Sequence, residues 1–210
     1  MRLTHLWSDP RPLWAGMALA AGFAAGAANA ASVTVQGLTF DDRMGGLVIH
    51  GASGRGTLDD PIVLHEDITD DGPAIVTING MNAAFGNLVR TQHTVGFALT
   101  KVVRNLTNRA WEVFELELRE KLALSSPYED GLSFGQDAME PVLMASDRFL
   151  DAYKTDEPLD SLVFSHGRVE PGETVAIRMV ITDYSPTYEF FLLQRRNAPV
   201  ARLESGPAIR

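Results

Sequence analysis

Four histidines are the side chains in this sequence that are best suited to catalysis. His50, His65, His93 and His166 lie far apart, and none falls in an HExxH or similar metal-binding spacing. A Ser–His–Asp set can assemble from distant positions, but no local motif marks one. The segment Gly51–Gly54 places its second glycine one residue too early for a nucleophile elbow. We therefore expect a protein without enzymatic activity and keep a hydrolase as the remote alternative.

Acidic residues between Ser125 and Asp160 could supply oxygen ligands for calcium. The metal candidates in this segment are Asp130, Asp156, Glu157 and Asp160. Asp70-Asp71-Gly72 is a further acidic candidate, and no group follows the D-x-D-x-D-G spacing of an EF-hand. Solvated acids in turns are the competing interpretation. We expect no cofactor, with a calcium-stabilised module as the alternative.

The same segment, Ser125–Asp160, also carries aromatic residues that could contact a ligand or a partner. Connections longer than about 12–15 residues are usually functional or disordered, and aromatic side chains give this one something to pack. The ligand or partner candidates are Tyr128, Phe134 and Tyr153. Carbohydrate platforms use exposed aromatic rings, so a sugar-binding module is a second alternative, to which Tyr184 and Tyr188 could also contribute.

The first 30 residues predict export. Arg2 and Arg11 flank a weakly basic start, Leu13–Ala27 is apolar or glycine throughout, and Ala28-Asn29-Ala30 ends in small residues two apart. This order is typical of a signal peptide cleaved after Ala30. The apolar run is shorter than the roughly 20 residues needed to span a bilayer core. We expect the processed chain to reside in the periplasm or outside the cell, with no membrane span.

Charge and composition restrict the partners. Loss of Arg2, Arg11 and Asp9 with the signal would change the formal charge from −9 to −10. A chain this acidic repels nucleic acid and anionic lipid, so we expect an extracytoplasmic protein or a surface component as the partner. The sequence has no cysteine, which excludes thiol chemistry and leaves an apolar core to hold the fold.

Most of the chain after the signal predicts strands. Alternation of apolar residues at period two is clearest around Val95–Lys101, Phe114–Leu118 and Val175–Ile181. Further strands are expected at Ser32–Phe40, Leu47–Ile49, Ile62–Leu64, Ala74–Ile78 and Tyr188–Leu193. Eight or more short strands separated by turn residues predict an all-β, antiparallel two-sheet β-sandwich spanning residues 31–194. Residues 195–210 are expected to form a flexible tail.

Two segments leave room for a helix. Trp111–Leu124 contains good helix formers, but its strict Phe-Glu-Leu-Glu-Leu-Arg alternation favours a strand. Within the long loop, a short helix is expected, if anywhere, between Asp137 and Tyr153. Trp111 is the only tryptophan after the signal, and a lone strand tryptophan in a sandwich favours a core position.

Two turns also have a structural interpretation. Pro171 and Gly172 fit the central positions of a turn, Gly172 at the one that needs positive φ. Asn105-Leu-Thr107 matches a glycosylation sequon, but its position between strands favours a turn. Neither motif requires a ligand.

Two series of motifs resemble secreted bacterial β-sandwich domains of the immunoglobulin-like or fibronectin-like kind. The first runs from Asn105-Leu-Thr-Asn108 through Trp111 and the Glu115–Leu118 strand to Asp130–Phe134; the second comprises Asp160–Phe164, Val169–Val175 and Phe191–Gln194. The resemblance covers Leu99–Gln194 and implies an immunoglobulin-like sandwich without assigning any catalytic residue. The expected function is binding or assembly outside the cytoplasm, with the edge strand Ser32–Phe40 as one candidate for pairing with a partner.

Overall fold

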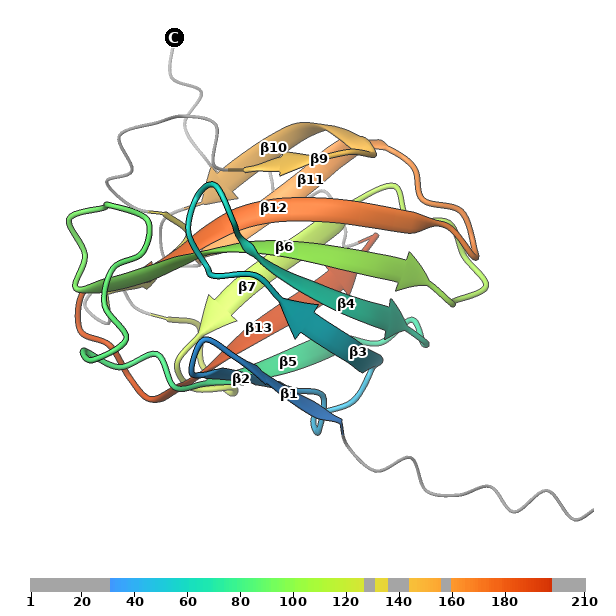
Figure 1. The fold of residues 1–210 in the computed structure, drawn as a ribbon. Helices are drawn as coiled ribbons and strands as arrows, with labels where there is room; N and C mark the ends of the chain where they lie inside the picture. The colour runs from blue at the N-terminus through green and yellow to red at the C-terminus, as the bar shows by residue number, and fades with distance from the viewer. Residues whose placement is uncertain (1–30, 127–130, 136–143, 156–159, 198–210) are drawn as a thin grey trace, which may run out of the picture.

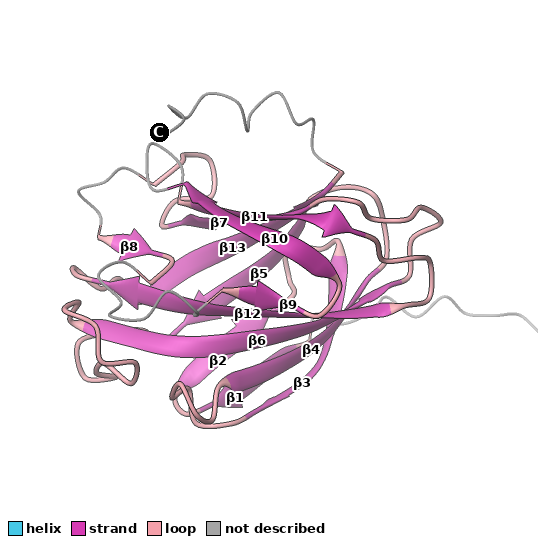
Figure 2. Ribbon diagram, turned by 90° about the horizontal axis from the view of Figure 1, so that it is seen from above, coloured by secondary structure: helices cyan, strands magenta, loops and turns pink. Residues whose placement is uncertain are grey.

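The computed structural model describes residues 31–126, 131–135, 144–155 and 160–197. These residues form two packed β-sheets and, within the described ranges, no helix (Figures 1 and 2). The all-β sandwich predicted from the sequence is confirmed at this level. No helix in the described part of the chain is long and apolar enough to cross a membrane.

Sheet A has seven strands in the order β1-β2-β5-β13-β7-β11-β10. Its strands, in chain order, are β1 (Ser32–Val35), β2 (Leu38–Asp41), β5 (Ala74–Asn79), β7 (Phe114–Arg119), β10 (Phe149–Thr155), β11 (Ser161–Gly167) and β13 (Glu189–Arg196). All of their pairings are antiparallel. The edges of sheet A are therefore β1 and β10.

Sheet B has six strands in the order β3-β4-β6-β12-β8, with β9 also paired to β12. Its strands are β3 (Leu47–Ser53), β4 (Ile62–Ile68), β6 (Val95–Asn105), β8 (Leu132–Ser133), β9 (Ala145–Ser146) and β12 (Thr174–Asp183). β4 and β6 run parallel, an exception to the expected antiparallel arrangement. The reason is that β5 crosses to sheet A between them, so β6 re-enters sheet B in the direction of β4 (Figure 1).

One apolar core fills the space between the sheets. Alternation decides which side chains enter it: Phe97 and Leu99 of β6, and Leu116 and Leu118 of β7, are fully buried. Trp111 is 1% exposed and belongs to this core, as predicted. Its ring lies 5.6 Å from that of Phe114.

The N-terminal segment forms two strands where the sequence predicted one. Gln36 and Gly37 both have positive φ, 52° and 85°. Such a pair is typical of the tight turn of a two-residue hairpin, and it folds β1 back onto β2. As expected, β1 lies at an edge of its sheet.

The segment predicted as a long loop contains strands. Ala145–Ser146 and Phe149–Thr155 are β9 and β10, so the helix expected within Asp137–Tyr153 is wrong over these residues. The remainder of that expected helix, residues 137–143, lies outside the described ranges. The reason for the error is local: β10 pairs with β11 on one side only, and its exposed residues need not alternate.

The C-terminal strand also extends further than expected. β13 continues to Arg196, two residues past Gln194. The Asn197 side chain accepts from the Glu112 amide at 2.8 Å and donates to the Ala110 carbonyl at 2.8 Å. Residues 195–197 are thus part of the sandwich, and residues 198–210 lie outside the described ranges.

Candidate functional site

Both ends of the segment Ser125–Asp160 are hydrogen-bonded to β7 or to the residues that directly follow it. The Leu118 amide of β7 donates to the Asp160 carbonyl at 2.9 Å, just before β11 begins. At the other end of this stretch, the Glu120 amide donates to the Ser126 hydroxyl at 3.1 Å. β7 and β11 therefore anchor the region in which the sequence placed a site.

Of the four predicted metal ligands, the structure describes only Asp160. This residue is 5% exposed at the start of β11, whereas Asp130, Asp156 and Glu157 lie outside the described ranges. Within those ranges, no group of three or more histidine, aspartate or glutamate side chains could hold a metal ion. Calcium binding by the four acids stays a prediction.

The predicted ligand-contacting residues separate into core and surface. Phe134 is 1% exposed and packs in the core. Tyr153 is 49% exposed on the edge strand β10, and Tyr128 lies outside the described ranges. Tyr184 and Tyr188, in the connection between β12 and β13, are each 65% exposed.

Edge strand β10 is the most exposed strand of sheet A. Four of its seven residues, Leu150 to Tyr153, are exposed, and Leu150 reaches 87%. Its inner side pairs with β11 in register, for example Tyr153 with Val163. Because it is the last strand of the sheet, its other backbone edge has no partner strand among the described residues. An edge of this kind can template pairing with another chain.

A cluster of four charged residues lies on the neighbouring strands β7 and β13 of sheet A. Arg119 Nε donates to Glu117 Oε1 at 2.6 Å, and Arg195 Nη1 lies 2.6 Å from Glu117 Oε2. Arg195 Nη1 also donates to Glu115 Oε1 at 3.2 Å. Two arginines thus balance two carboxylates, and the cluster contributes no net charge to sheet A.

Glu117 is almost completely covered, at 1% exposed. Burial alone would raise the pKa of its carboxyl group, but hydrogen bonds from Arg119 and Arg195, and their positive charges, outweigh burial. The pKa of Glu117 is therefore below its usual range. A carboxylate held ionised in this way stabilises the fold and is a poor proton donor.

An ion pair that the sequence did not predict lies inside the core. Lys101 Nζ of β6 donates to Glu66 Oε2 of β4 at 2.7 Å, and neither side chain is exposed. Burial lowers the pKa of Lys101, partly offset by the charge and hydrogen bond of Glu66. The signal was present in the sequence: Lys101 continues the inward series of Phe97 and Leu99.

A third charged residue, Arg196 of β13, is partly buried near Trp111. The Arg196 guanidinium lies over the Trp111 ring, 5.9 Å from its centroid, and its Nη2 donates to the carbonyl of Asp70 at 2.7 Å and to that of Gly72 at 2.5 Å. Burial lowers the pKa of Arg196, opposed by the charges of Asp70, Asp71 and Glu66.

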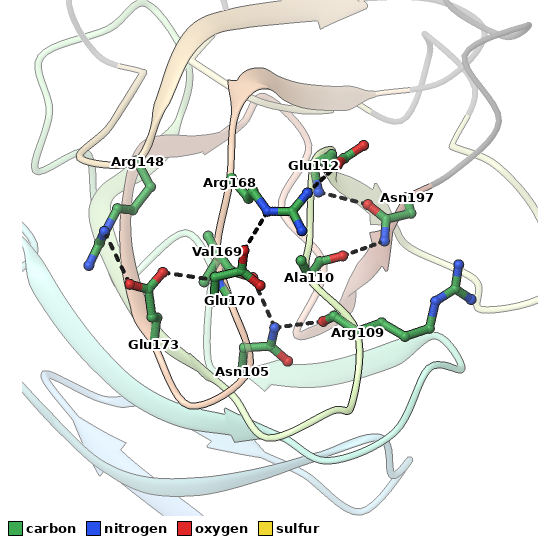
Figure 3. Close-up of polar contacts among 10 residues, drawn as sticks. All are labelled: Asn105, Arg109, Ala110, Glu112, Arg148, Arg168, Val169, Glu170, Glu173 and Asn197. Carbon is green, nitrogen blue, oxygen red and sulfur yellow. Dashed lines mark hydrogen bonds and ion pairs between the residues drawn. The ribbon is translucent and has the colours of Figure 1, made fainter.

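A hydrogen-bonded network closes one end of the sandwich (Figure 3). The Asn105 side chain donates to the carbonyl groups of Arg109 at 2.9 Å and Val169 at 3.1 Å. Its Oδ1 accepts from the Thr107 amide at 3.0 Å and hydroxyl at 2.7 Å. Asn105 is fully buried, which agrees with the interpretation of the sequon as a turn.

Ion pairs surround this network at the surface. Arg168 Nε donates to Glu170 at 2.5 Å and its Nη1 pairs with Glu112. Hydrogen bonding to Glu170, together with the nearby charges of Glu170 and Glu112, raises the pKa of Arg168. The Arg168–Glu112 pair joins two connections that are far apart in the sequence, so the network has a structural role.

Comparisons of the chain with models of protein families, with curated proteins and with solved structures found no match. The surface features described above are therefore the basis for a functional conclusion.

Proposed function

We propose that the protein is an exported, non-enzymatic β-sandwich that acts in binding or assembly outside the cytoplasm. The edge strand β10 carries the proposal, since among the described residues no strand pairs with its outer side, and Leu150 and Tyr153 expose their side chains there. Main-chain hydrogen bonds to an added strand give affinity, and alternate side chains give specificity. The expected partner is another extracytoplasmic protein or a surface component.

The surroundings of β10 favour a partner strand over a small ligand. Asp151 pairs with His166 at 2.8 Å on the adjacent strand, which leaves a surface of mixed charge beside apolar side chains. The self-balanced cluster of Glu115, Glu117, Arg119 and Arg195 lies on the same sheet and adds no net charge to it. An added strand would extend sheet A without disturbing either feature.

Site-specific photo-crosslinking in the exporting cell tests this proposal. A photoreactive residue at position 150 should form one defined adduct, whereas the same residue at Leu124, which is 61% exposed off the edge, should not. Tyr153→Lys should abolish the adduct, because a charge on an edge strand opposes strand addition. Equal adducts at positions 150 and 124, or an adduct unaffected by Tyr153→Lys, would count against β10.

Carbohydrate binding is the second candidate function. Tyr184 and Tyr188 are two well-exposed rings in one short connection, and Tyr184 is held by an edge-to-face contact with His93 at 6.2 Å. Calorimetric titration with oligosaccharides should detect binding that Tyr184→Ala and Tyr188→Ala abolish while Tyr153→Ala retains it. Loss of binding only in Tyr153→Ala would reject this assignment.

We further propose that the sandwich belongs to the immunoglobulin-like class that its motifs resemble. The support is the packing of two largely antiparallel sheets around the core tryptophan Trp111. An experimental structure whose strand connections differ from those of immunoglobulin-like domains would reject this class while leaving the binding proposal intact.

A further inference from the structure

The carboxylate of Asp42 links Ala31, the residue before β1 of sheet A, to β3 of sheet B. Its Oδ1 accepts from the Ala31 nitrogen at 2.7 Å, and its Oδ2 accepts from the Ile49 amide at 3.0 Å. The Asp42 amide in turn donates to the Ala31 carbonyl at 3.2 Å. Ala31 directly precedes β1 at the edge of sheet A, and Ile49 lies on β3 at the edge of sheet B.

This carboxylate is buried without a cation. Asp42 is 8% exposed, and no lysine, arginine or histidine of the described ranges forms an ion pair with it. A buried charge that only neutral donors contact pays a desolvation penalty that a nearby positive charge would offset. The Ala31 nitrogen is in position to become that charge.

We propose that a signal peptidase hydrolyses the Ala30–Ala31 bond and that the new α-ammonium group of Ala31 forms an ion pair with Asp42. Water adds to the Ala30 carbonyl carbon, the C–N bond breaks, and Ala30 departs as a carboxylate. The Ala31 nitrogen keeps its hydrogen and takes up two protons, because an α-amino group has a pKa of about 7.7–8.0. The inference rests on the export signal predicted from Ala28-Asn29-Ala30 and goes beyond the proposed binding function.

The geometry needs no rearrangement for this change. The 2.7 Å separation between Ala31 N and Asp42 Oδ1 already lies in the range of charge-assisted N–H···O bonds. Hydrolysis therefore converts a neutral hydrogen bond into an ion pair in place. The processed chain has its β1–β2 hairpin fastened to β3 more firmly than the precursor.

The first test identifies the cleaved bond. The full chain, residues 1–210, is expressed in an exporting bacterial host, and the recovered product is examined by intact mass and N-terminal sequencing. Ala31 is expected as the first residue. A product that begins at any other residue, or that retains the signal segment, would overturn the proposal.

The second test isolates the charge. A chain that begins at Ala31 is compared with one that carries a single additional glycine, which keeps the Ala31 N–H but moves the positive charge one residue away. The chain that begins at Ala31 should melt about 2–4 °C higher, a shift typical of one added ion pair in a domain of this size. Equal melting temperatures would contradict the ion pair.

Variants of the carboxylate assign the effect to Asp42. With Asp42→Asn, the chain that begins at Ala31 and the chain with the extra glycine should melt at the same temperature. Asp41→Asn alters a carboxylate that accepts from the Arg43 amide, and it should preserve the difference in melting temperature. A difference that persists in Asp42→Asn would contradict the pairing. If Asp42→Asn does not fold, the melting temperatures with and without the extra glycine are compared in the parent chain and in Asp41→Asn. Equal temperatures in the parent chain contradict the ion pair.

Discussion

Lys101 and Glu66 form an ion pair of 2.7 Å between neighbouring parallel strands, with both side chains fully buried. Because both charges must be desolvated, such a pair adds little to the free energy of unfolding. Removal of one partner nevertheless leaves an unpaired charge in the core. The pair therefore acts mainly on specificity. It favours the register in which Lys101 and Glu66 meet, because a shift of one residue would separate the charges.

Loss of a single member of this pair should be costly. We expect Glu66→Leu or Lys101→Met to lower the free energy of unfolding by about 3–5 kcal/mol. The double variant Glu66→Leu/Lys101→Met should recover most of that loss. Urea unfolding, followed by the fluorescence of the buried Trp111, measures each value. Additive losses in the double variant would show that the two charges do not interact.

Glu117 should make the fold sensitive to acid. Its pKa is lowered in the folded state by Arg119 and Arg195 against the opposing effect of burial. The stabilisation is therefore fully present above the ordinary glutamate pKa of about 4.3 and is lost as pH falls through the lower, folded value. Between pH 6 and pH 3, the melting temperature of Glu117→Gln should fall less steeply than that of the parent chain. Glu112→Gln, at an exposed carboxylate, is the control and should leave the decline unchanged.

Asn105 should be required for the turn that closes one end of the sandwich. Asn105→Ala removes donors to the carbonyl groups of Arg109 and Val169 in a buried setting. We expect a loss of about 1–3 kcal/mol for each group left unsatisfied, measured by chemical unfolding. Arg109→Ala, which changes an exposed side chain of the same turn and keeps the carbonyl, should cost little. A similar loss in both variants would contradict a specific role for the amide.

Substitution of Gly172 should strain the backbone without causing a steric clash. Its φ is +87°, and nothing lies within 4 Å of the position a Cβ would occupy. Gly172→Ala should therefore cost about 1–2 kcal/mol from the left-handed conformation alone. Gly51→Ala is a matched control, since Gly51 has equal space and no positive φ. Equal stability of Gly172→Ala and the parent chain would refute the assigned turn.

Strands with buried faces were predictable from the sequence, because burial imposes alternation. β6 and β12 show this, with Phe97, Leu99, Ile177 and Met179 all facing the core. Strand β10 was not predictable in the same way. Leu150 and Tyr153 lie on opposite sides of an exposed edge strand, so no apolar face required a regular pattern.

Polar features that depend on two distant strands were harder to predict. Lys101 at an inward position indicated a buried charge, and Glu66 occupies an inward position after Ile62 and Leu64. Their meeting also required the parallel arrangement of β4 and β6, which arises because β5 belongs to the other sheet. The interaction between Asp42 and Ala31 likewise depends on the β1–β2 hairpin, which the sequence had suggested only as one strand.

Amide hydrogen exchange on β10 tests whether a partner strand adds to this edge of sheet A. It is measured on the purified processed chain and on the same chain in the complex recovered by crosslinking at position 150. We expect fast exchange at the exposed residues Leu150–Tyr153 in the free chain and strong protection in the complex, with β3 unchanged in both. Unchanged exchange along β10, or protection confined to another strand, would contradict strand addition at this edge.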